Sequence, residues 1–114
     1  MARIDSFHGM MTLRLVAYAV ALNQHRSFAR AAQAMGVTQP TFSRAIAALE
    51  RSLAVRLFVR SSRRVAPTPE GVLFLTHAER LLAGAAQLRA ALGDYQHLRS
   101  GRLVVGVGPY PLEI

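Results

Sequence analysis

The chain has 114 residues, of which 52% are hydrophobic and 18% charged, a globular composition with room for one domain and its core. It contains no cysteine, which excludes a disulfide scaffold, a thiolate metal site and a cysteine nucleophile. Fourteen basic residues face six acidic ones, for a net charge of +8, and all fourteen are arginine. Codon usage in a GC-rich genome accounts for the missing lysine, and guanidinium groups also suit phosphates and guanine edges.

The positive charge is concentrated in one part of the chain. Residues 26–64 contain eight arginines and a single acidic residue, Glu50, and therefore carry a net charge of +7. Residues 1–25 add +1, and residues 65–114 sum to zero. A basic stretch in a nearly neutral chain predicts a polyanionic partner.

The sequence predicts a cytoplasmic protein without a membrane span. The longest uncharged run, Ala31–Ser43, has thirteen residues and is interrupted by Gly36 and Pro40, whereas a transmembrane helix needs about 20 residues. The first ten residues lack the apolar core of a signal peptide, and the absence of cysteine fits a reducing compartment.

Two short helices are predicted after a loose tail at residues 1–11. Thr12 is a suitable cap for a helix that runs to about His25, because apolar residues recur there at helical spacing. Ser27 is a suitable cap for a second helix over Phe28–Met35, whose alanines permit close helix packing.

A tight turn is predicted between the second helix and a third. Gly36 stands where a left-handed residue ends a helix, and Thr38 caps a third helix over Gln39–Leu53. On this helix four apolar side chains share one face: Phe42, Ile46, Leu49 and Leu53. Small or basic residues lie opposite them: Pro40, Arg44, Ala47 and Arg51. One face is therefore expected to pack, and the other to be free and basic.

A short hairpin is predicted next. The β-rich run Val55–Arg60, a serine turn and a return over residues 63–66 place arginines at its tip, and Pro67 ends the return strand. Helix, tight turn, helix and basic hairpin form a winged helix-turn-helix, whose third helix enters a major groove about 12 Å wide. We therefore predict a mainly α fold, with this domain over residues 12–67.

A long dimerisation helix is predicted over residues 68–98, with Thr68 as its cap and Pro69 in its first turn. Apolar residues spaced alternately three and four apart form a coiled-coil seam, which predicts a homodimer: Phe74, Ala78, Leu81, Ala85, Leu88, Leu92 and Tyr95. A second stripe is expected to join this helix to its own winged domain: Val72, Leu75, Leu82 and Ala86. Residues 99–114 are predicted to be a hinge and the first strand of a further domain.

One pattern runs from Ala21 to Glu50: Ala-x5-Ser-Phe-x-x-Ala-Ala-x-x-Met-Gly-Val-Thr-Gln-Pro-Thr-Phe-Ser-Arg-Ala-Ile-x-x-Leu-Glu. Leu57-Phe58-x-Arg60 and Thr68-Pro69-Glu70-Gly71 follow at the expected distances. Together these motifs resemble the LysR-type transcriptional regulators, over nearly the whole chain. Two residues depart from that pattern: Ala54 stands where the family has glycine, and Pro67 removes a backbone donor from the hairpin.

The resemblance implies a DNA-binding domain, a dimerising linker helix and a C-terminal effector domain, of which this chain is expected to hold only the first strand. It also implies interrupted palindromic sites in double-stranded DNA, tetramers at full length, and a small-molecule co-inducer bound in the effector domain. It places eight residues at the DNA, five on the recognition helix and three on the wing: Gln39, Pro40, Thr41, Ser43, Arg44, Arg60, Arg63 and Arg64.

Several of these residues have a structural alternative. Arg44 is either a DNA contact or a solvated charge, and Gln39 either pairs with adenine or is simply exposed. Thr38 is predicted to be a cap rather than a base contact. Arg51 and Arg56 are predicted to be surface residues or intrahelical partners. Three phenylalanines are predicted to be core residues rather than stacking platforms: Phe28, Phe42 and Phe58.

No catalytic residue, metal site or cofactor is predicted. The closest acidic pair, Glu70 and Glu79, falls on opposite helix faces, and the four histidines lack ligand spacing. Two other classes of protein remain as alternatives to a transcription regulator. A coiled-coil adaptor would use its arginines for solubility and would not bind DNA at physiological salt. A non-specific nucleoid or RNA-binding protein would bind all duplexes equally, or prefer RNA.

Overall fold

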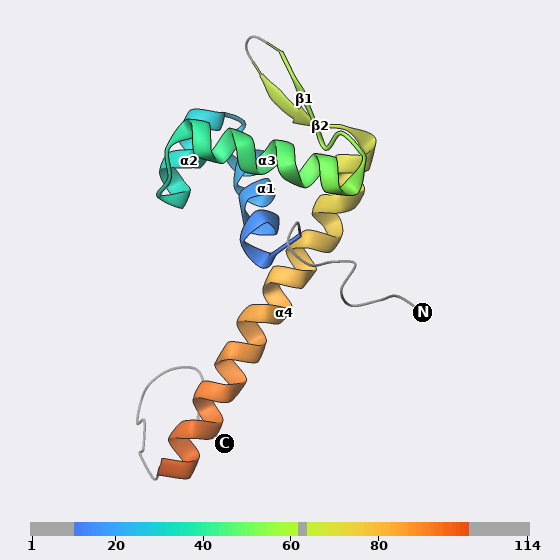
Figure 1. The fold of residues 1–114 in the computed structure, drawn as a ribbon. Helices are drawn as coiled ribbons and strands as arrows, with labels where there is room; N and C mark the ends of the chain where they lie inside the picture. The colour runs from blue at the N-terminus through green and yellow to red at the C-terminus, as the bar shows by residue number, and fades with distance from the viewer. Residues whose placement is uncertain (1–10, 62–63, 101–114) are drawn as a thin grey trace. The chain divides into compact units, whose positions relative to one another are not determined.

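A computed structural model describes residues 11–61 and 64–100 of the chain. Four helices and two strands follow one another in the predicted order (Figure 1): α1 (Leu13–His25), α2 (Phe28–Met35), α3 (Gln39–Leu53), β1 (Phe58–Arg60), β2 (Val65–Pro67) and α4 (Pro69–Ser100). The mainly α winged helix-turn-helix with a long C-terminal helix is therefore confirmed. Arg99 and Ser100 were predicted to begin the hinge, but they belong to α4, which continues through them. The rest of the predicted hinge and the predicted strand after it lie outside the described residues.

Each helix begins at a hydroxyl residue, as the sequence predicts. The side-chain oxygen of each cap accepts a hydrogen bond from the backbone N–H three residues further on: Thr12, Ser27, Thr38 and Thr68. These bonds satisfy donors that the first turn of a helix leaves unpaired, and each is worth about 1 kcal/mol. The local sequence therefore defines where the helices start.

The core lies where α1, α2 and α3 meet. Phe42 is fully buried; its ring stacks on Tyr18 at 5.0 Å between centroids and meets Phe28 edge-on at 6.0 Å. Ile46 and Leu49 are also fully buried, which confirms the apolar face predicted for α3. Because this face packs inward, the opposite face of α3 is turned away from the core.

Strands β1 and β2 form an antiparallel pair with Phe58 opposite Pro67 and Arg60 opposite Val65. Phe58 is fully buried and anchors the hairpin to the core. Pro67 occupies the last pair of the ladder, and pairing in the described strands covers three residues on each side. This agrees with the short wing expected from a proline that cannot donate a hydrogen bond.

The chain divides into two compact units, residues 1–82 and residues 83–114, and α4 runs through the boundary. In the first unit, α4 buries Gly71, Leu75 and Ala78, which are spaced four and three residues apart. Of the predicted inward stripe, Leu75 is buried as expected, whereas Val72 is 54% exposed; Ala78, predicted to lie in the dimer seam, is buried instead. Two apolar stripes lie side by side on this helix, and only the neighbouring elements decide which residues turn inward.

Candidate nucleic-acid interface

The outward face of α3 carries the predicted recognition residues. Four are exposed, namely Gln39, Pro40, Thr41 and Arg44, and Ser43 is half-buried. Among the described residues, the side chains of Gln39 and Arg44 have no hydrogen-bond or ion-pair partner. The structure therefore brings all five residues to the first half of one helix, where two long polar side chains remain available to a ligand.

Thr38 is engaged at the start of α3, as the sequence predicts for a cap. Its Oγ1 accepts a hydrogen bond from the backbone N–H of Thr41 at 3.3 Å and donates its proton to Oγ1 of Thr41 at 3.0 Å. The Thr41 hydroxyl therefore has its own proton free to donate outward. This bond orients Thr41 while leaving it a donor for a base edge or a phosphate.

The wing turn is closed by hydrogen bonds between its two ends. The backbone N–H of Ser61 donates to the carbonyl oxygen of Arg64 at 3.0 Å, and Oγ of Ser61 accepts from the backbone N–H of Arg64 at 3.1 Å. Arg64 is exposed at this turn. Arg63, also predicted to contact DNA, lies outside the described residues.

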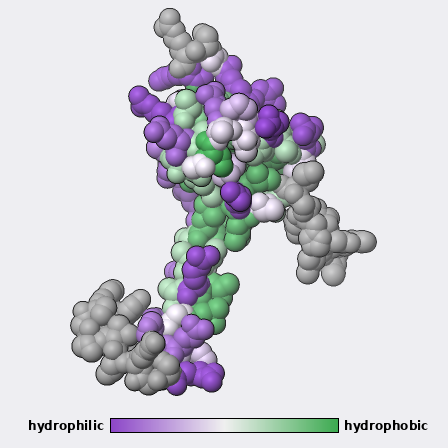
Figure 2. Space-filling model, turned by 60° about the vertical axis from the view of Figure 1, so that its left-hand side comes forward, coloured by the Kyte–Doolittle hydropathy of each residue, from purple (hydrophilic) through white to green (hydrophobic). Residues whose placement is uncertain are grey.

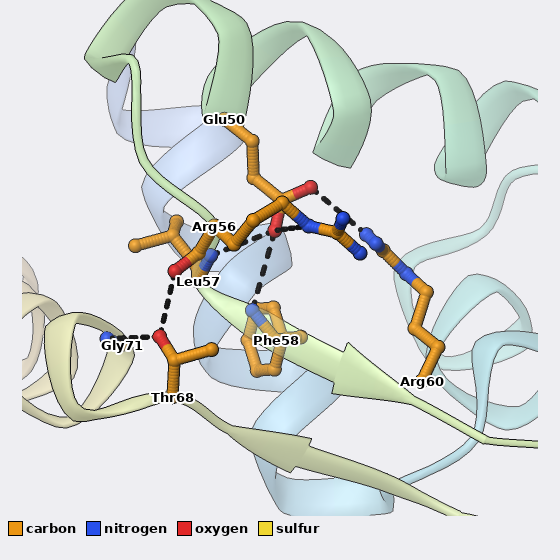
Figure 3. Close-up of polar contacts among 7 residues, drawn as sticks. All are labelled: Glu50, Arg56, Leu57, Phe58, Arg60, Thr68 and Gly71. Carbon is orange, nitrogen blue, oxygen red and sulfur yellow. Dashed lines mark hydrogen bonds and ion pairs between the residues drawn. The ribbon is translucent and has the colours of Figure 1, made fainter.

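A buried carboxylate, that of Glu50, connects the end of α3 to the wing (Figure 3). Glu50 is 7% exposed, and its Oε2 accepts hydrogen bonds from the backbone N–H groups of Leu57 at 2.7 Å and Phe58 at 3.2 Å. Its Oε1 accepts a bond from the Arg60 guanidinium at 3.0 Å, and Nε of Arg56 lies 3.8 Å from Oε2. Three short hydrogen bonds therefore tie the first residues of the wing to the recognition helix.

Arg60 has partners within the fold, although it was predicted to contact DNA. Besides its bond to Glu50, its guanidinium lies 5.3 Å from the centre of the Phe28 ring on α2, and its side chain is 30% exposed.

The role of Glu50 in joining α3 to the wing was not predicted from the sequence. The available signal was that Glu50 is the one acid within a stretch of net charge +7, which makes an ion pair with a nearby arginine favourable.

The seam predicted on α4 is divided between two environments. Ala78 is buried, and Phe74 packs against the core of its own domain. The larger remaining members are between 48% and 64% exposed: Leu81, Leu88, Leu92 and Tyr95. Figure 2 shows hydrophobic surface along α4. Exposed apolar side chains in a row are typical of a helix that packs against another chain.

Within residues 11–61 and 64–100, no three histidine, aspartate or glutamate side chains gather closely enough to hold a metal ion. Over the same part of the chain, none of the helices combines the length and the apolar character needed to cross a membrane.

Comparison with known proteins identifies a family whose members have similar sequences. Residues 13–72 match the model of the bacterial regulatory helix-turn-helix protein, lysR family. The SDS degradation transcriptional activation protein of a Pseudomonas species is 48% identical over 102 residues, which cover 90% of this chain and 33% of that protein. The DNA-binding transcriptional dual regulator OxyR of Escherichia coli is 40% identical over 106 residues, or 90% of this chain and 35% of that protein.

A solved structure extends the comparison to the fold. BenM_DBD, in its complex with benA site 1 DNA, superposes with a TM-score of 0.73 at 37% sequence identity, covering 75% of this chain and 97% of that chain. This chain itself spans about a third of the length of the curated relatives that it matches.

Proposed function

Because the chain belongs to the LysR family of bacterial regulatory helix-turn-helix proteins, we propose that it is the DNA-binding part of a transcription regulator. In this proposal it binds double-stranded DNA at specific sequences and carries out no catalysis. The observation that carries the proposal is the outward face of α3. This face is not packed against the core, and it presents polar side chains without partners among the described residues. The relatives' names, which describe regulators of transcription, support the same conclusion.

In the proposed complex, α3 lies in the major groove and the wing lies on the adjacent backbone. Gln39 can form paired hydrogen bonds with adenine, and Arg44 can do so with guanine. Pro40 is small and rigid and lets the helix approach the bases, while Thr41 and Ser43 supply short hydroxyl donors. Arg63 and Arg64 of the wing are proposed to bind phosphates of the DNA backbone. Arg60, whose guanidinium is bonded to Glu50, would bind a phosphate with its remaining N–H donors.

We propose that the bound form is a homodimer held by the seam on α4. One winged domain offers few base contacts, too few to distinguish one site among the many in a genome, whereas two domains at a fixed spacing read two half-sites. An interrupted palindromic operator follows from that symmetry. For the full-length protein we propose a tetramer, with a small-molecule co-inducer bound in a C-terminal effector domain, on the strength of the family resemblance.

Selection of binding sites from a pool of random duplexes tests this function. A regulator enriches one sequence with two related half-sites. A non-specific nucleoid protein enriches none, an RNA-binding protein prefers RNA in competition, and a coiled-coil adaptor retains no duplex at physiological salt. Each of the last three outcomes would reject sequence-specific recognition.

Removal of one side chain separates base recognition from phosphate binding. We expect Arg44→Ala to cost about 1–3 kcal/mol of binding free energy and to relax the preference at one position of each half-site. The control Arg64→Ala is expected to weaken binding to all sequences alike. Fluorescence anisotropy with a panel of single-base operator variants measures both. Uniform losses in both variants would contradict base recognition by Arg44.

A further inference from the structure

A hollow of about 470 Å³ lies between the second half of α3 and the start of the wing. Three arginines and one carboxylate line it, with small side chains that leave it open: Arg51, Arg56, Arg60, Glu50, Ala47 and Ala54. We call this hollow the corner site. Figure 3 shows Glu50, Arg56 and Arg60 converging there from α3, the following loop and β1.

The charges of the corner site do not balance. Three guanidinium groups against one carboxylate leave two positive charges in excess. Glu50 accepts three hydrogen bonds, from two backbone N–H groups and from Arg60. Arg56, with a side chain 66% exposed, is only loosely paired to it at 3.8 Å. Arg51 is exposed and has no hydrogen-bond or ion-pair partner among the described residues. Two guanidinium groups are thus available to an anion.

The corner site continues the recognition surface along α3. Arg44, Ala47 and Arg51 are spaced three and four residues apart and therefore share one face of the helix. In the proposed complex, with the first half of α3 in a major groove and the wing on the flanking backbone, one DNA strand would cross the gap between α3 and β1. The corner site forms the floor of that gap, and the alanines leave space for a phosphate group.

We propose that the corner site seats a DNA backbone phosphate, held by the guanidinium groups of Arg51 and Arg56. This inference rests on the proposed function, because it takes duplex DNA as the ligand. It gives a DNA-binding role to two arginines that the sequence predicts to be surface residues or intrahelical partners. The buried Glu50 carboxylate then serves to position the wing side of the site, while the guanidinium groups of Arg51 and Arg56 supply the binding charge.

The salt dependence of binding to a random-sequence duplex tests the proposal with the whole chain. Each phosphate contact releases about one counterion, so losing one lowers the slope of log affinity against log salt by about one. Removing both arginines together, in Arg51→Ala/Arg56→Ala, is expected to lower the slope by that amount; each single variant is expected to lower it by part of that amount, and Arg51→Lys to keep it. Arg80→Ala, which removes the same charge from an exposed position on α4, is the matched control and is expected to keep the wild-type slope.

A second measurement alters the DNA, and its effect on the wild-type chain does not depend on how any variant folds. In a selected duplex, single phosphates are replaced in turn by neutral methylphosphonates. One position is expected to weaken binding of the wild-type chain about as much as Arg51→Ala/Arg56→Ala does, and to have no further effect on that double variant. Additive losses at every position, or a wild-type salt slope for Arg51→Ala/Arg56→Ala, would overturn the corner site.

The two proposals fail in different ways. If the wild-type chain binds every duplex equally but the slopes fall as expected, sequence specificity is wrong and the corner site holds. If the chain selects an operator but its slope is insensitive to Arg51 and Arg56, the corner site is wrong and the proposed function holds. A chain that binds no duplex at all would overturn both.

Discussion

Glu50 shows how a single residue can connect two elements of the fold. A buried carboxylate is costly to desolvate, and it is tolerated only where hydrogen bonds and an opposite charge replace the lost water. Glu50 meets this condition through the amides of Leu57 and Phe58 and through Arg60. These partners lie seven, eight and ten residues further along the chain, so the bonds form only when the wing folds back onto α3.

Removing the carboxylate is expected to destabilise the winged domain. Glu50→Ala leaves two buried N–H groups and one guanidinium without their acceptor, which costs about 3 kcal/mol. Glu50→Gln keeps the size and one acceptor oxygen and is expected to cost less. Urea denaturation followed by circular dichroism measures both free energies of unfolding. Equal losses for the two variants would contradict the role assigned to these hydrogen bonds.

Two residues that end helices differ in how easily they adopt the left-handed backbone conformation found there. Gly36 and Ala54 both adopt the left-handed conformation, with φ of 75° and 59°, but Ala54 carries a Cβ that this conformation disfavours. Ala54 is also the position at which the resemblance to the family expects glycine. The turn after α3 therefore keeps the geometry that a glycine would adopt, at some cost in stability.

Opposite substitutions at these two positions are expected to have opposite effects. Ala54→Gly is expected to stabilise the domain by about 0.5–1 kcal/mol, since relief of strain exceeds the added entropy of the unfolded chain. Gly36→Ala is expected to destabilise it by a similar amount, because no atom crowds that position and only the backbone conformation is affected. Thermal unfolding of both variants measures this, and shifts of the same sign would contradict it.

At the scale of elements, the start of α4 depends on close approach to the loop before the wing. A Cβ on Gly71 would overlap the carbonyl oxygen of Leu57. Thr68 reinforces this contact, because its Oγ1 accepts from the N–H of Gly71 and donates to the carbonyl oxygen of Arg56 at 2.6 Å. Glycine is present here for space, despite its poor helix propensity.

Gly71→Ala is therefore expected to destabilise the domain by about 2 kcal/mol, the cost of forcing the helix away from the loop. The control Gly93→Ala lies on the same helix with nothing near its added Cβ, and should instead gain about 1 kcal/mol from helix propensity. Chemical denaturation separates the two. A stabilising Gly71→Ala would show that the helix and the loop can move apart freely.

At the scale of the whole molecule, α4 packs against the winged domain at its start and exposes an apolar row further along. Its first turns are buried against the winged domain at Gly71, Leu75 and Ala78. Beyond Leu82, large apolar side chains such as Leu88 and Leu92 are exposed in the single chain. A row of this kind is stable in water when a second helix covers it, which is the physical basis of the proposed dimer.

A charge in the seam is expected to separate the dimer without unfolding the chain. Leu88→Arg is expected to give folded monomers with unchanged helix content and weak operator binding. Ala90→Arg adds the same charge on an exposed position outside the seam and is expected to remain dimeric. Analytical ultracentrifugation at micromolar concentration distinguishes these states. A monomeric wild-type chain, or a dimeric Leu88→Arg variant, would refute the seam as the interface.

The sequence alone determined the helices, their caps and the winged order of elements, because these depend on neighbours within one or two turns. The side chains of Thr12, Ser27 and Thr38 cap their helices by hydrogen bonds to residues only three positions further along the chain. The spacing of apolar residues along α3 defines its inward face. The exposed recognition residues follow from that face. Their contacts with DNA, like the seam on α4, remain predictions.

Only the tertiary structure decided which side chains meet across elements. Arg51 is next to Glu50 in the sequence, yet the carboxylate pairs with Arg60 and lies near Arg56, because the hairpin returns beneath the end of α3. Likewise Ala78 rather than Val72 is buried on α4. Periodicity gives the relative angles of residues around a helix, but the direction in which the helix faces is decided by the surface on which it packs.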